Sequence, residues 1–165
     1  IITLNSLIQL RNKVKEAFAT MDVYLKRRWD LIPSLVEIVK GYATHEKDTF
    51  ENVADLRSNS YDNMNQKDKI NSNLKMNDLI KKLMLLKENY PELKANQNFM
   101  DLSKNLTETE DLIANSRKYY NAVVRMYNNK VEMFPSNLVA KLLGYKDEKM
   151  FEATEEEKQN VNVSL

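Results

Sequence analysis

Residues 27–42 read RRWDLIPSLVEIVKGY and decide where the helices of this chain begin and end. Apolar residues recur in this stretch at helical spacing, but Pro33 stands among them. A proline inside a helix removes a backbone hydrogen bond, and its ring clashes with the carbonyl group four residues earlier, here that of Trp29. The chain either turns near Asp30, a residue type that caps new helices, or continues through a kink. We expect the turn.

The composition and the apolar periodicity on both sides of this stretch predict an all-α protein. Two glycines and three prolines in 165 residues are too few for the many turns of a sheet protein. Apolar residues recur at steps of three and four, which indicates amphipathic helices. A polar stretch, SNSYDNMNQK at residues 58–67, predicts a loop. The predicted helices span residues 3–29, 31–57, 68–89 and 96–134, followed by a short helix at 136–143.

Four amphipathic helices with short connections predict an antiparallel up-and-down four-helix bundle with a short C-terminal helix. We assign residues 1–146 to this bundle and 147–165 to a C-terminal tail that packs on the bundle or extends from it. In such a bundle the first and third connections share one end. We therefore expect Trp29, in the first connection, to pack near Tyr90 or Phe99, in the third.

Bulk composition speaks against several classes of function. The net charge is +1 with both signs mixed along the chain, so no field favours nucleic acid. There is no cysteine, and the single histidine, His45, has no glutamate three residues before it, so we expect no metal and no cofactor. His45 beside Glu46 could act as an acid–base pair, but a solvated or core-edge histidine is the commoner case. We expect no enzyme.

No run of 18 apolar residues is present, so no transmembrane helix is expected within these residues. The chain begins at Ile1 rather than at a methionine. We therefore expect an upstream segment, which could include a signal or a membrane anchor.

Charged residues on the apolar faces predict an interior polar cluster. Counting about 1.5 Å per residue from the shared end of the bundle places Glu46 and Glu110 at nearly one level. Two arginines lie one to two turns further along. Such networks set helix register more than they add stability. The expected cluster consists of Arg11, Glu46, Glu110 and Arg117.

A tyrosine–asparagine pair repeats at a seven-residue step in the last long helix. The two pairs are Tyr120–Asn121 and Tyr127–Asn128. A cofactor site is one interpretation, and core packing with a ladder of hydroxyl and amide groups is the one we favour.

Five ordered stretches make the chain similar to the LemA family of bacterial proteins over nearly its whole length. Leu4 departs from an aromatic residue common in that family, and Ser116 from a small apolar one. The stretches are NSLIQLRNKV (5–14), DVYLKRRWDLIPSLVEIVKGYATHE (22–46), YPELKANQNFMDL (90–102), TEDLIANSRKYYN (109–121) and YNNKVEMFPSNLVAKLLGY (127–145).

The resemblance implies a helical bundle behind one N-terminal transmembrane helix, without an established reaction. Ile1 and Ile2 are then the end of the anchor or its linker, and the protein is expected at the cell membrane. We expect a non-enzymatic interaction or scaffold domain of a bacterial envelope with an unidentified protein partner. The alternative is a sensor domain that binds a small ligand between its helices, in a pocket lined by Tyr120, Tyr127 and the arginines and glutamates of the interior cluster.

Bundle topology, rather than the resemblance, gives the expected interaction end, because the first and third connections meet there. A structural lock of the bundle end is the interpretation we favour, and a docking surface for a partner is the alternative. The residues of this end are Arg27, Arg28, Trp29, Asp30, Tyr90, Asn96 and Asn98.

Overall fold

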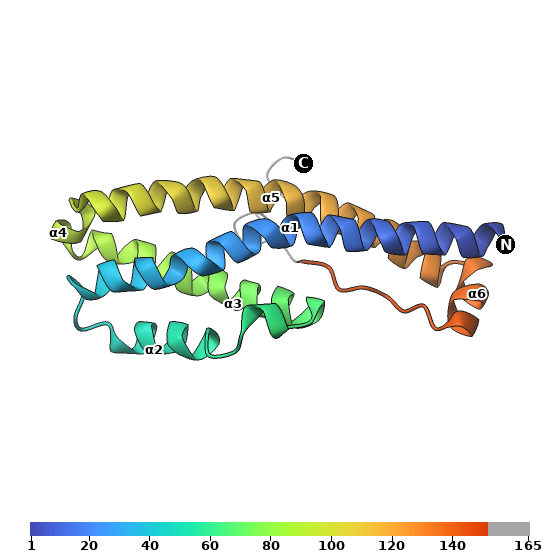
Figure 1. The fold of residues 1–165 in the computed structure, drawn as a ribbon, viewed down its shortest axis with the longest axis horizontal. Coiled ribbons are helices and arrows are strands. Elements are labelled where there is room, and N and C mark those ends of the chain that lie inside the picture. Colours follow the sequence, from blue (N-terminus) through green and yellow to red (C-terminus); the bar gives the residue numbers. More distant parts are fainter. Residues whose placement is uncertain (152–165) are drawn as a thin grey trace.

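A computed structural model describes residues 1–151, and within this range every regular element is helical (Figure 1). The all-α prediction is therefore confirmed for these residues. The predicted tail at 147–165 lies outside the described residues from residue 152 onward. The elements are α1 (Ile2–Lys40), α2 (Lys47–Leu56), η1 (Tyr61–Asn63), α3 (Gln66–Leu85), η2 (Leu86–Glu88), α4 (Pro91–Lys94), α5 (Gln97–Glu132) and α6 (Ser136–Leu143).

The two long helices, α1 and α5, form an antiparallel pair that runs the length of the molecule (Figure 1). Their register is visible in side-chain contacts: Phe18 meets Tyr120 with ring centroids 5.8 Å apart, and Arg28 meets Glu110 at 2.9 Å. Helices α2 and α3 lie along one half of this pair only (Figure 1). Along the other half lie α6 and the segment that follows it.

The predicted turn near Asp30 is wrong, because α1 continues through Pro33 to Lys40. The apolar face of the helix continues past the proline, with Ile32, Leu35 and Val39 all fully buried. Burying each such side chain contributes roughly 1.5–3 kcal/mol, which together exceeds the ~3 kcal/mol cost of an interior proline. Pro33 itself is on the exposed side, so its ring takes no space in the core.

The first break therefore falls at residues 41–46, and the predicted helix at 31–57 is divided between the end of α1 and α2. The predicted loop at 58–67 contains the turn η1, and α3 begins at Gln66, where the Asn65 side chain accepts the Asp68 N–H at 2.8 Å. Asn96 caps α5 in the same way, accepting the Phe99 N–H at 2.9 Å. The short helix predicted at 136–143 has the bounds of α6.

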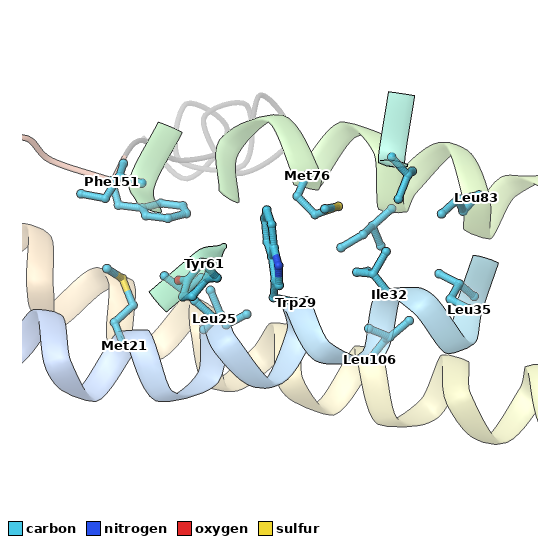
Figure 2. Packing of buried hydrophobic residues seen from close by; sticks show 14 of the residues in the cluster. Met21, Leu25, Trp29, Ile32, Leu35, Tyr61, Met76, Leu83, Leu106 and Phe151 are labelled. Atoms are coloured by element: carbon cyan, nitrogen blue, oxygen red, sulfur yellow. The ribbon is translucent and has the colours of Figure 1, made fainter. Parts of the chain in front are cut away.

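Trp29 lies in the middle of α1 and is 3% exposed, so the prediction that it occupies a connection at a bundle end is wrong. Its ring packs on Tyr61 with centroids 5.1 Å apart, and Figure 2 shows it within the row of buried side chains between Tyr61 and Met76. Because Arg28 pairs with Glu110, Trp29 lies at about the level of Thr109 on α5. Phe99 is ten residues earlier on that helix, which corresponds to about 15 Å along the axis.

Residues 145–151, which we call the strap, follow α6 without helical structure. Gly144 ends α6 in the left-handed conformation, with φ 78°, and turns the chain back along α5. The strap ends at Phe151, which is 1% exposed and joins the core on the side of Met21 (Figure 2). The strap and α6 thus cover the half of the long pair that α2 and α3 leave open.

A proline-to-alanine change tests the continuity of α1. Pro33→Ala should raise the free energy of unfolding by up to ~3 kcal/mol, because alanine restores the backbone hydrogen bond and little packing is lost at an exposed position. Pro91→Ala is the matched control, since Pro91 opens α4 at a position that favours proline, and it should give no gain. Chemical denaturation measures both, and a loss of stability in Pro33→Ala would contradict a continuous helix.

Candidate functional site

Arg28 is the centre of a buried polar network, although it is a charged residue with only 1% of its surface exposed. Its Nη1 donates to Glu110 Oε1 of α5 at 2.9 Å and to Asn77 Oδ1 of α3. Its Nη2 donates to Asn73 Oδ1 at 3.0 Å and to the Asn73 carbonyl oxygen at 3.3 Å. One guanidinium group therefore joins α1, α3 and α5.

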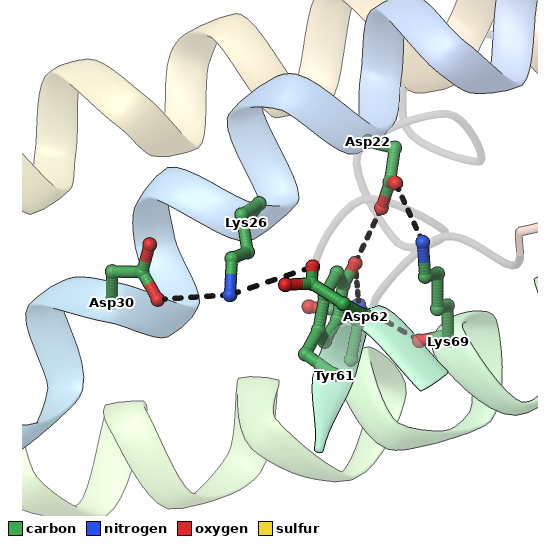
Figure 3. Close-up of polar contacts among 7 residues, drawn as sticks. Asp22, Lys26, Asp30, Tyr61, Asp62 and Lys69 are labelled. Carbon is green, nitrogen blue, oxygen red and sulfur yellow. Dashed lines mark hydrogen bonds and ion pairs between the residues drawn. The ribbon is translucent and has the colours of Figure 1, made fainter. Parts of the chain in front are cut away.

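The network continues from Asn73 toward the surface through η1 (Figure 3). Asn73 Nδ2 donates to the Tyr61 hydroxyl at 3.1 Å, and that hydroxyl donates to Asp22 Oδ1 at 2.6 Å. Lys69 Nζ meets the other carboxylate oxygen of Asp22 at 2.9 Å. Burial, and then the hydrogen bond to Asp22, raise the pKa of Tyr61 far above its ordinary value, so the hydroxyl keeps its proton and continues to donate.

The structure does not bring the four residues of the expected interior cluster together. Glu110 is in the network, but its partner is Arg28. Arg11 is about 26 Å from Arg28 along α1, with its guanidinium 4.8 Å from the Tyr145 ring centroid. Glu46 lies before α2, beyond the end of α1, and Arg117 is buried on α5. The predicted level of Glu46 depended on a turn at Asp30, and the continuous helix carries Glu46 to the far end.

Sequence reasoning missed Arg28 as the central cation because it placed this residue in a connection. The pattern that identifies it is the apolar face of α1, since Met21, Leu25, Arg28 and Ile32 follow one another at steps of three and four and all four are buried. An arginine on that face must find partners for its donors inside the protein.

The seven residues of the expected interaction end fall into two separate groups. In α1, Arg28 and Trp29 are buried, Arg27 donates to Asn105 Oδ1 at 2.9 Å, and Asp30 pairs with Lys26 at 3.3 Å. Tyr90 and Asn96 flank α4. Asn96 Nδ2 donates to the hydroxyl of Tyr42 at 2.8 Å, and Tyr42 lies just beyond the C-terminus of α1, more than ten residues from Asp30. Asn98 is exposed near the start of α5.

The repeated tyrosine–asparagine pairs of α5 hold the strap by its main chain. Asn121 accepts the Phe151 N–H at 2.8 Å and donates to the Phe151 carbonyl oxygen at 2.6 Å. Asn128 does the same with Glu148, at 2.8 Å and 3.0 Å. Between them the Tyr120 hydroxyl donates to the Lys149 carbonyl oxygen at 2.7 Å. The predicted ladder of hydroxyl and amide groups therefore pairs chiefly with the main chain of the strap, and Tyr120 also accepts from a side chain of α3.

Tyr120 is fixed as a donor by its surroundings. Burial is the main cause that raises its pKa to about 12, with Glu148 adding to the rise and a hydrogen bond from Gln66 opposing it. Gln66 Nε2 donates to the Tyr120 hydroxyl at 2.7 Å, so the hydroxyl's own proton is left for the strap carbonyl group.

Residues 1–151 contain no group of three or more histidine, cysteine, aspartate or glutamate residues that could hold a metal ion. His45 is exposed in the connection between α1 and α2. Within the same range, no helix has both the length and the apolar character needed to cross a membrane.

Comparison with known proteins assigns the sequence to a family. The sequence model of the LemA family matches residues 17–165. The chain is 25% identical to Protein LemA of Metamycoplasma hominis over 161 residues, which cover 97% of this chain and 74% of that protein. It is 22% identical to the magnetosome proteins MamQ 1 and MamQ 2 of Paramagnetospirillum magneticum, over 90% of this chain and 64% of each of those proteins.

Removing the central cation should destabilise the fold more than removing its exposed neighbour. Arg28→Ala should lower the free energy of unfolding by roughly 2–5 kcal/mol, because it deletes a large buried side chain and leaves the buried Asn73 carboxamide oxygen without its donor. Arg27→Ala, one residue away and exposed, should cost about 0.5–1.5 kcal/mol for one hydrogen bond. Urea denaturation compares the two variants, and equal losses would show that Arg28 is not the centre of the network.

Strap docking should depend on pH through Glu148. Burial raises the pKa of Glu148 above its ordinary value of 4.5, while Lys15 of α1 opposes the rise. Tyr120 and Tyr127 of α5 and Lys67 of α3 also face this region. An acid whose pKa is higher when docked binds its proton more tightly there, so docking is strongest below the ordinary pKa and weakens as the pH rises through the raised value.

The measurement for this prediction is the hydrogen-exchange protection factor of the Phe151 amide, corrected for the intrinsic effect of pH on exchange. Protection should fall across that pH range in the unmodified chain and fall less in Glu148→Gln, where the hydrogen bond to Asp147 of the strap still raises the pKa of Glu132 of α5. The same decline in both chains would assign the effect to another group.

Proposed function

Because the chain belongs to the LemA family, we propose that it is a non-enzymatic, membrane-tethered interaction domain of a bacterial cell envelope. The observation that carries the proposal is an apolar surface at the end of the molecule where the chain begins. The N-terminus of α1 and helix α6 lie together at that end (Figure 1).

Apolar side chains are exposed at this end to an unusual degree. In α6, Leu138 and Leu142 are 60% and 84% exposed, and their spacing of four residues places them on one helix face. The opposite face of α6, with Ser136 and Ala140, is buried against the long helices. We name this surface the apolar end: Ile1, Ile2, Met133, Phe134, Leu138 and Leu142.

An apolar end beside the N-terminus is what a tethered domain would present to a bilayer. An anchor preceding Ile1 would hold this end at the membrane surface, where leucine and phenylalanine side chains leave water. Helix α1, with 39 residues, then carries the opposite end about 58 Å from the bilayer. The side of the long pair that holds the strap would be reachable by partners along that length.

A groove between α1 and α2 favours the alternative function, a sensor of small ligands. Its volume is about 290 Å³, and Ile32, Val36, Phe50 and Val53 form its apolar wall, with Arg57 among the other lining residues. It is not the pocket expected at Tyr120 and Tyr127, whose side chains are buried. The interaction domain remains our first proposal because the apolar end lies where the anchor would enter.

Vesicle binding tests the orientation. The chain should co-sediment with phosphatidylcholine–phosphatidylglycerol vesicles, and the double variant Leu138→Gln/Leu142→Gln should bind at least about tenfold more weakly, since each buried leucine contributes roughly 1.5–3 kcal/mol. The matched control is Leu85→Gln/Met100→Gln, which changes two exposed apolar residues near the opposite end. Equal loss in both double variants, or no vesicle binding at all, would overturn the proposed orientation.

A further inference from the structure

The hydrogen bonds from α5 to the strap are made to the main chain of the strap. Each asparagine of the pair Asn121 and Asn128 both accepts an N–H and donates to a carbonyl group of a single strap residue. A carboxamide is matched to the peptide unit in this way, because it offers one acceptor and donors side by side. Any extended segment with free N–H groups at these positions could make the same bonds.

The spacing of the two asparagines fits an extended peptide. Seven helical residues rise about 10.5 Å, and three extended residues span about 10 Å. The residues bound, Glu148 and Phe151, are three apart, and their order shows that the strap runs antiparallel to α5. Asparagines seven residues apart on α5 can therefore bind every third residue of an extended chain that runs alongside the helix.

The side chain of Phe151 in the strap is buried in the core. Phe151 is 1% exposed within the core cluster, whereas Lys146, Asp147 and Lys149 are exposed. An aromatic side chain in a pocket, preceded by backbone contacts, is a common arrangement in the recognition of extended peptides. Tyr145 and Met150 are only partly buried against the same core, so specificity would come chiefly from the aromatic position of Phe151.

Residues 146–151 of the strap belong to no helix, whereas the Tyr145 N–H caps α6 by donating to the Ala140 carbonyl oxygen at 2.9 Å. The strap begins after Gly144, whose left-handed conformation already ends α6. Strap residues 147–149 also border a hollow of about 420 Å³ beside Gln66 and Lys67 at the start of α3. The middle of the strap is thus attached to α5 and only loosely packed against α3.

We propose that Tyr120, Asn121 and Asn128 of α5, together with the pocket that holds Phe151, form a binding site for an extended segment of a partner protein, which the strap occupies in cis. We call this the strap site. The inference rests on the proposed interaction function and names the class of partner. The partner segment carries an aromatic residue at the position of Phe151 and has no proline there or at the position of Glu148, because both N–H groups are bonded.

The first experiment measures binding of a labelled peptide, YKDEKMF, which repeats residues 145–151. The receptor is the full chain with Phe151→Ala, which releases the strap. Fluorescence anisotropy should show saturable binding, at least about tenfold tighter than to the unmodified chain, because a tethered competitor acts at millimolar effective concentration. Thermal unfolding of the variant, followed by circular dichroism, establishes that it is folded.

Variants of the receptor assign the binding to the strap site. Adding Asn121→Ala should weaken the peptide about 30-fold, the effect of losing two neutral hydrogen bonds. Adding Asn129→Ala should leave affinity unchanged, since this asparagine is exposed on the same helix. Equal effects of the two changes would overturn the site.

Variants of the peptide test the mode of recognition. Alanine at its two lysines and its aspartate should leave affinity unchanged, whereas alanine in place of its phenylalanine should abolish measurable binding. Proline at the position of Glu148 should do the same, because it removes the N–H that Asn128 accepts. Binding that survives the phenylalanine change, or needs the charged residues, would overturn main-chain recognition with an aromatic anchor.

A measurement on the unmodified chain avoids any effect of Phe151→Ala on folding. Excess peptide should increase hydrogen exchange at the chain's own Glu148 and Phe151 amides while exchange in the middle of α1 stays constant. Unchanged exchange at saturating peptide would contradict displacement. A stable dimer of the unmodified chain that Asn121→Ala dissociates would show that the occupant is the strap of a second copy, and would overturn a separate partner.

Failure of this inference can be told apart from failure of the proposed function. If the strap site binds no peptide but the membrane-anchored full-length protein captures a partner that Asn121→Ala does not release, the interaction function stands and the strap site falls. If the full-length protein captures no partner and the strap site binds no peptide, both fall.

Discussion

The antiparallel contact between α1 and α5 is the constraint on which the rest of the structure depends. It buries one continuous apolar face of α1, on both sides of Pro33, and so outweighs the cost of a proline inside the helix. Arg28 fixes the register of this contact, because its donors must meet Glu110 and the asparagines of α3 at one level. A shift of one turn would leave a buried charge unpaired.

The unequal lengths of the helices create the second feature of the fold. Helices α2 and α3 cover only one half of the long pair, and the other half needs a different cover. Helix α6 and the strap provide it, with Phe151 completing the core where the two halves meet. An extended segment has main-chain groups that no helix satisfies, which is why α5 presents amide side chains there.

Much of this could be predicted from the sequence. The scarcity of glycine and proline indicates helices, the asparagines at 65 and 96 are suitable caps, and the bounds of α6 follow from Pro135 and Gly144. The tyrosine–asparagine repeat was recognisable as a ladder. Its partner was not, because a pairing across 20 or 30 residues with a segment of no regular structure leaves no periodicity in the sequence.

The sequence by itself determined the all-α class, the family and the residue types available for polar contacts, because periodicity and motif order are local properties. Tertiary structure alone decided whether Pro33 ends a helix, since that depends on how much apolar surface beyond the proline is buried. It also decided that Arg28, rather than Arg11 or Arg117, meets Glu110. Helix α1 ends at Lys40 instead of near residue 29, and this difference changes which side chains of α1 and α5 lie at the same level.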